Sequence, residues 1–127
     1  MIGDGARHGG LVFRAGGALA FAPVSAVVKL VVMPKVARVP GAPSSLLGVA
    51  LVDGEAIPVV AIGASRTHML VCTYLGERLG LVGIESLASG TFPADPASPE
   101  GVRYEGASVP ALDLAKVYAS LQRSPWA

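Results

Sequence analysis

The residues that could carry catalysis are two histidines and one cysteine, and their spacing does not form a site. His8 lies in a glycine-rich segment near the N-terminus, and His68 precedes Cys72 by four residues. If His68 and Cys72 share a strand, they face the same side but stand about 13 Å apart, too far for the imidazole to activate the thiol directly. We therefore expect a buried, unreactive Cys72 and predict that the protein is not an enzyme.

The acidic residues and glycine-rich pieces offer no other chemistry. Asp95 and Glu100 fall in a proline-rich stretch, and Asp113 precedes a helical pattern, positions typical of a solvated surface or a helix N-terminus. Two histidines and one cysteine lack the spacing of metal ligands. No glycine-rich piece joins a strand to a long helix, as a phosphate-binding loop does. The sequence predicts no metal site and no cofactor.

Composition favours a small β-rich protein. The chain has 127 residues, of which 52% are apolar and 15% charged, and its 16 glycines and 10 prolines disfavour a helical bundle. The net charge of +1 is scattered, so neither nucleic acid nor an anionic membrane is an expected partner. No uninterrupted apolar run reaches the roughly 18 residues of a membrane-spanning helix. Without a secretion signal, and with a single cysteine, a cytoplasmic location is expected.

Short β-prone runs separated by turn residues predict the strands. We expect them over residues 11–14, 18–22, 27–33, 48–52, 55–62, 67–74, 79–84, 102–104 and 107–109. Asp53-Gly54 is a dipeptide favoured in the tightest hairpin turns, where both central residues need positive φ. The order of many short strands with frequent corners is typical of a small β-barrel.

The segments between and after these strands complete the prediction. Ser44 or Ser45 is expected to cap one helical turn, and the proline-rich residues 88–101 are expected to form a loop. One helix is predicted over residues 111–122, because apolar residues recur there with helical spacing. The expected organisation is a flexible leader over residues 1–9, a single domain over 10–122 and a tail over 123–127.

Residues 27–62 resemble the signature region of the CheW-like family, the adaptors of bacterial chemosensory arrays. The pattern is a strand with a charged residue, a proline-flanked turn, a strand that begins Gly-Val, and a Pro-Val-Val strand. Its matching residues here are Arg38, Val39, Pro40, Pro43, Gly48, Val49, Gly54, Pro58, Val59 and Val60. The resemblance implies an all-β fold with a C-terminal helix, built as two intertwined, five-stranded SH3-like barrels.

The resemblance also implies a groove between the lobes in which receptor cytoplasmic tips dock, and a separate surface for the histidine kinase. Mapped onto this chain, the receptor groove comprises Val27, Lys29, Leu30, Gly48, Asp53 and Gly54. Gly48 is expected to keep the approach between the lobes narrow. The family typically has an acid at the position of Lys29 and an arginine at that of Asp53. A Lys29–Asp53 pair would keep this geometry with inverted charges, while two solvated surface charges are the alternative.

The predicted function is that of a non-catalytic chemosensory adaptor, with chemoreceptors and a histidine kinase as partners. The loops are short for the family, so an accessory adaptor that binds receptor but not kinase is one alternative. A second alternative, from another class, is a small β-barrel that binds a small molecule between its lobes, because apolar clefts with few polar groups are the usual form of such sites.

Overall fold

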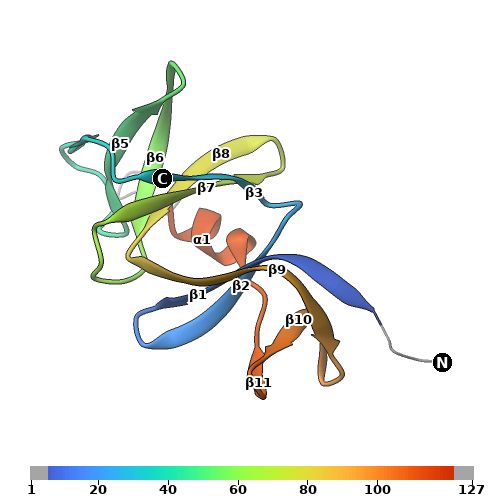
Figure 1. Ribbon diagram of the computed structural model, residues 1–127. Helices are drawn as coiled ribbons and strands as arrows, with labels where there is room; N and C mark the ends of the chain where they lie inside the picture. Colours follow the sequence, from blue (N-terminus) through green and yellow to red (C-terminus); the bar gives the residue numbers. More distant parts are fainter. Residues whose placement is uncertain (1–5, 122–127) are drawn as a thin grey trace.

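The computed structural model describes residues 6–121, which form two β-sheets and one helix (Figure 1). The five-stranded sheet, in the order β11-β10-β9-β1-β2, contains β1 (Arg7–Ala15), β2 (Ala18–Pro23), β9 (Ile84–Asp95), β10 (Ser98–Tyr104) and β11 (Ala107–Val109). The six-stranded sheet, in the order β3-β7-β8-β6-β5-β4, contains β3 (Val27–Val32), β4 (Val36–Ala37), β5 (Leu46–Val52), β6 (Glu55–Ala61), β7 (His68–Tyr74) and β8 (Glu77–Val82).

The two sheets are interleaved in the sequence. The chain starts the first sheet with β1 and β2, builds the whole second sheet with β3 to β8, and then returns to complete the first with β9 to β11. This confirms the predicted all-β fold of two intertwined lobes with a C-terminal helix. The second sheet has six strands rather than five, because the two-residue β4 pairs with β5 at its edge.

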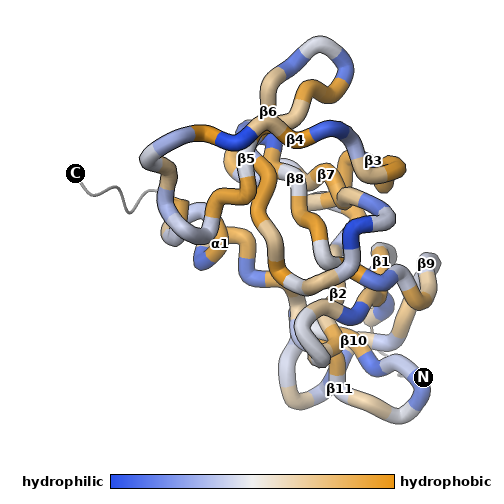
Figure 2. The backbone as a smooth tube through the Cα atoms, turned by 90° about the vertical axis from the view of Figure 1, so that its left-hand side faces the viewer, coloured by the Kyte–Doolittle hydropathy of each residue, from blue (hydrophilic) through white to orange (hydrophobic). Residues whose placement is uncertain are grey.

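Tight turns join the hairpins as the sequence predicts. Asp53 and Gly54 have φ angles of 51° and 81° and connect β5 to β6. Leu75 and Gly76 have nearly the same left-handed φ angles, 52° and 82°, and form the turn between β7 and β8. In Figure 2 hydrophilic residues gather in such connections, while long apolar stretches follow the strands.

Three apolar clusters hold the fold together. The first lies where the two sheets and the helix meet and joins residues such as Phe13, Leu70 and Leu81, all fully buried. The second fills the concave side of the six-stranded sheet, and the third packs β1, β2, β10 and β11 together. Complete burial of one such side chain contributes about 1.5–3 kcal/mol, so the first cluster couples the two sheets energetically.

The helix α1 (Leu114–Leu121) begins three residues later than predicted. Asp113 is its N-cap, because the carboxylate Oδ1 accepts a hydrogen bond from the Lys116 amide at 3.0 Å. The preceding residues are extended instead: the Leu112 amide donates to the Phe21 carbonyl at 2.8 Å and ties this segment to β2. Gln122 and the expected tail over residues 123–127 lie outside the described residues.

Three further predictions about segments are wrong. Residues 7–9 of the expected leader belong to β1, where Arg7 pairs with Pro93 and Gly9 with Thr91 of β9. The expected loop over residues 88–101 is therefore largely strand. No helical turn forms at Ser44 or Ser45, which lie in a turn before β5; instead the Ser45 hydroxyl donates to the Ser120 carbonyl of α1 at 3.2 Å.

Candidate protein-binding site

An apolar groove of about 570 Å³ opens between the two sheets. Strands β1 and β9 form one wall, and β3 and β7 form the other. Its apolar lining comes from Leu11, Val24, Val27, Leu30 and Leu70. Val24 is 69% exposed and Leu30 is 40% exposed, so this surface is open to a partner. Concave apolar surfaces of this kind are typical of sites for ligands or protein partners.

Residues of β1 and β9 that the sequence did not indicate complete the groove. Gly10 faces Gly90 across the strand pair. A Cβ on Gly10 would stand 2.1 Å from the Ala22 carbonyl oxygen, so only glycine fits there. The polar part of the lining comes from β9, through Ser86, Ser89 and Thr91. The prediction missed Ser89 and Thr91 because it assigned residues 88–101 to a loop, and it missed Ser86 because it ended the preceding strand at residue 84. The β-prone pair Thr91-Phe92 was the available signal.

A bulge at Val28 divides the residues of β3 between two faces. Val27 and Leu30 pair with Cys72 and Leu70 of β7, whose side chains belong to the cluster between the sheets. Lys29 pairs instead with Val71, which belongs to the cluster inside the six-stranded sheet. The structure therefore brings Val27 and Leu30 into the groove and places Lys29 on the opposite face of β3.

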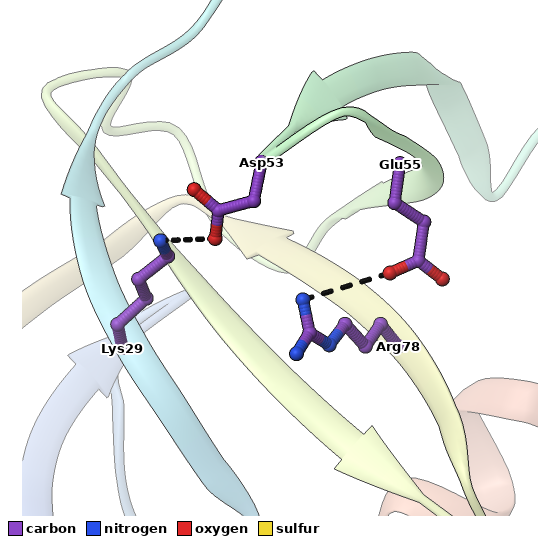
Figure 3. A network of polar contacts seen from close by, with 4 residues as sticks. All are labelled: Lys29, Asp53, Glu55 and Arg78. Carbon is purple, nitrogen blue, oxygen red and sulfur yellow. Dashed lines mark hydrogen bonds and ion pairs between the residues drawn. The ribbon is translucent and has the colours of Figure 1, made fainter.

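Lys29 and Asp53 form an ion pair, as the inverted charges suggest (Figure 3). The Lys29 ammonium donates to the Asp53 carboxylate, and this hydrogen bond is the main reason why the pKa of Asp53 lies below its ordinary value. The two residues are not on neighbouring strands, because β7, β8 and β6 lie between β3 and β5. Their contact shows that the sheet curls until its β5–β6 turn meets β3.

A second ion pair lies beside the first. Arg78 Nη1 of β8 stands 3.5 Å from Glu55 Oε1 of β6 (Figure 3). Side chains of all four residues are more than one-third exposed, so solvent screens both pairs and each adds little to stability. The four side chains form a polar rim on the six-stranded sheet, separate from the apolar groove.

Gly48 and Gly54 have structural roles in the β5–β6 hairpin. A Cβ on Gly48 would stand 2.3 Å from the Ala37 carbonyl oxygen, so its missing side chain lets β4 close against β5. The prediction that Gly48 keeps the space between the lobes narrow is therefore wrong, because the element that packs closely against Gly48 is β4 of the same sheet and not the other lobe. Gly54 supplies positive φ to the turn, and a Cβ added there would have nothing within 4 Å.

The candidate catalytic residues do not meet. Cys72 is fully buried, and burial raises its pKa to about 12, so its thiol stays protonated and unreactive. His68 is exposed and its Nδ1 lies 3.2 Å from the Thr67 hydroxyl. Within residues 6–121, no three side chains of histidine, cysteine, aspartate or glutamate gather as metal ligands. Nor does any helix in that range have the length and apolarity to cross a membrane.

Two curled, interleaved sheets with an apolar groove between them define a β-rich binding module. The family model for the CheW-like domain matches residues 9–88, and the chain belongs to this family. It is thereby a CheW-like chemotaxis scaffold, as the resemblance implied.

The fold is similar to that of the scaffolding protein TtCheW from Thermoanaerobacter tengcongensis, with a TM-score of 0.71. The match has 18% sequence identity and covers 89% of this chain and 88% of that chain, so it shows the common fold. A comparison with curated proteins finds no match.

Proposed function

We propose that this protein is a non-catalytic adaptor of a bacterial chemosensory system, which works in the cytoplasm and binds the cytoplasmic tip of a chemoreceptor in its inter-sheet groove. The observation that carries the proposal is the apolar groove itself, lined by Val27 and Leu30 in a CheW-like domain. The buried thiol and the scattered histidines support a binding role over catalysis.

An amphipathic helix is the kind of element that fits this groove. Such a helix presents apolar side chains at positions i, i+3 and i+4 on one face, and helix-in-groove docking buries that face against an apolar surface. The hydroxyls of Ser86, Ser89 and Thr91 would meet the polar residues that flank it. Leu30 is a large apolar residue of this lining, is 40% exposed, and is therefore the residue to test.

The test measures binding of a receptor cytoplasmic fragment by calorimetry. Leu30→Glu places a charge against the apolar surface, and we expect at least about a tenfold loss of affinity, equivalent to about 1.4 kcal/mol. Leu75→Glu is the matched control, because Leu75 is 85% exposed in the β7–β8 turn, outside the groove lining. Equal affinity of Leu30→Glu and wild type would contradict the assignment of the groove.

A second assay addresses the histidine kinase. We propose a contact between this chain and the regulatory domain of the kinase, which would make the protein a full coupling adaptor. Binding of both receptor and kinase supports that role, whereas binding of receptor alone identifies an accessory adaptor. Thermal stabilisation by a metabolite without any receptor binding would instead favour a small-molecule site in the groove.

A further inference from the structure

The apolar groove between the sheets adjoins a second cavity whose lining is polar. This cavity has a volume of about 360 Å³, and we call it the polar pocket. Its lining residues are Ser65, Thr67, His68, Ile84, Glu85 and Ser86. Because Ser86 also lines the groove, the two cavities share a wall. A partner in the groove therefore meets apolar side chains along one part of its length and hydrogen-bonding groups along the next.

Both walls of the groove run toward the polar pocket. On β7, His68 of the pocket lies two residues from Leu70 of the groove, which places it on the same face of the strand and about 7 Å away. On β9, Ser86 lies three residues from Ser89 of the groove. Val32 of β3 pairs with His68 and is 75% exposed, so the described chain leaves this end of the groove uncovered.

The hydroxyls and the imidazole of the pocket form a connected polar surface. The Thr67 hydroxyl lies 3.3 Å from the Ser65 hydroxyl and 3.2 Å from Nδ1 of His68. A hydroxyl both donates and accepts hydrogen bonds, and a neutral imidazole has one nitrogen of each kind. The pocket thus offers donors and acceptors together, which suits a partner group that also has both.

The charges around the pocket offset one another. Glu85 is the only carboxylate in the lining, and Arg14 of β1 is its neighbour across the strand pair. Arg66, between two residues of the lining, donates its Nη1 to the carbonyls of Gly63 and Ser65 at 2.8 Å and 3.0 Å. One carboxylate between two guanidinium groups favours a neutral polar partner over a charged one.

We propose that the polar pocket binds a carboxamide side chain, of asparagine or glutamine, on the receptor helix that docks in the groove; this rests on the proposed function. A carboxamide combines a carbonyl acceptor with an NH₂ donor. On a helix, the fourth residue along lies on the same face and about 6 Å further, close to the separation of Leu70 and His68. The helix thus packs an apolar residue on Leu30 and places the amide beside Thr67 one turn later. A partner without the amide would leave polar groups unpaired, so the pocket adds specificity.

Calorimetry with a receptor cytoplasmic fragment tests the proposal. Thr67→Val removes the hydroxyl without a change of size, and we expect about a fivefold loss of affinity, the effect of one hydrogen bond. Thr73→Val is the matched control, because it makes the same change on β7 outside both linings and should not affect binding. Glu85→Gln should also leave the affinity unchanged. Circular dichroism verifies that each variant remains folded.

A double-mutant cycle then identifies the partner group. Each asparagine of the fragment is changed to leucine and each glutamine to methionine, with wild type and with Thr67→Val. One of these changes should cost less affinity with Thr67→Val than with wild type. Additive effects at every amide position, or unchanged affinity of Thr67→Val, would overturn the proposal. A larger loss from Glu85→Gln than from Thr67→Val would indicate a cation in the pocket and would also overturn it.

Leu30→Glu separates this proposal from the proposed function. If Leu30→Glu loses affinity while Thr67→Val does not, the receptor occupies the groove and the assignment of the polar pocket alone is wrong. If Leu30→Glu binds the fragment as well as wild type does, the groove is not the receptor site and the assignment of the pocket fails with it.

Discussion

At the scale of single residues, the charge pattern of Lys29 and Asp53 was readable from the sequence, while their surroundings were not. The resemblance to the CheW-like family indicated that two opposite charges had changed places, and the ion pair confirms that they meet. The bulge at Val28 places Lys29 on the opposite face of β3 from Val27, and it depends on how β3 registers against β7. That register is set by contacts between distant segments, so a linear pattern does not contain it.

The first prediction concerns this ion pair. We expect Lys29→Glu and Asp53→Arg to lower stability only slightly, because the side chains are 38% and 58% exposed and solvent screens their attraction. Each should weaken receptor binding, though less than Leu30→Glu, because the pair lies on the other face of the groove strand. The double variant, with both Lys29→Glu and Asp53→Arg, should recover the stability and the receptor affinity that the single variants lose. Stability and receptor affinity of the four proteins form a double-mutant cycle, and additive effects in both would show that the pair does not act as a unit.

The second prediction concerns Asp95, which is 2% exposed and holds the end of β9. Hydrogen bonds from the Ser108 hydroxyl and then from the Ala97 amide hold its pKa below the ordinary value of 3.8. The pKa of Asp95 is therefore lower in the folded chain than in the unfolded chain. The stability that the ionised carboxylate contributes is fully present above the unfolded pKa, and it is lost as the pH falls through the folded pKa.

Asp95→Asn should therefore be less stable than wild type at neutral pH, and the difference should shrink as the pH drops below about 3.8. Urea titrations across a series of pH values measure it. Ser108→Ala removes the largest cause of the pKa shift and should weaken this pH dependence. A difference between wild type and Asp95→Asn that stays constant down to the lowest pH would contradict the assignment.

At the scale of elements, hairpins with short turns were predictable and the long non-local strand was not. Asp53-Gly54 and Glu105-Gly106 specify their turns locally, and the structure shows positive φ at all four residues. By contrast, β9 is held by pairing with β1, some 80 residues earlier in the chain. Prolines in the stretch obscured this strand, although Pro93 is tolerated near the end of its pairing with β1.

The third prediction concerns the junction between β8 and β9, where the chain passes from one sheet to the other at Gly83. Its φ is 90°, and an added Cβ would stand 2.2 Å from the Gly63 carbonyl oxygen. Gly76 has a similar φ of 82° but nothing within 4 Å of such a Cβ. Gly76→Ala thus measures the cost of positive φ alone, which is about 1–2 kcal/mol.

Gly83→Ala should cost at least about 1–3 kcal/mol more than Gly76→Ala, because the backbone at Gly63 must also shift. The free energy of unfolding in urea gives both values. If both variants lost the same free energy of unfolding, the backbone at the β8–β9 junction would be able to accommodate a side chain at Gly83 without further cost.

At the scale of the whole molecule, the sequence indicated two intertwined lobes through the family resemblance, whereas strand counting alone indicated only a small barrel. The coupling between the lobes comes from the first apolar cluster. Five residues of the six-stranded sheet contribute to it with their side chains facing the other sheet and α1: Val60, Leu70, Cys72, Leu79 and Leu81. If the two sheets separated, these side chains would lose their cover.

The last prediction follows from this shared core. Exposing five buried side chains at about 1.5–3 kcal/mol each costs on the order of 10 kcal/mol, which is comparable to the total stability of an ordinary domain. The contiguous segment over residues 24–83, which contains all six strands of the second sheet, should therefore not fold alone. In the intact chain, amide hydrogens in β7 and in β1 should exchange with the same free energy of opening, because neither sheet survives the loss of the other. Hydrogen exchange followed by mass spectrometry measures both, and a stably folded fragment or a lower opening free energy confined to one sheet would show that the lobes are independent units.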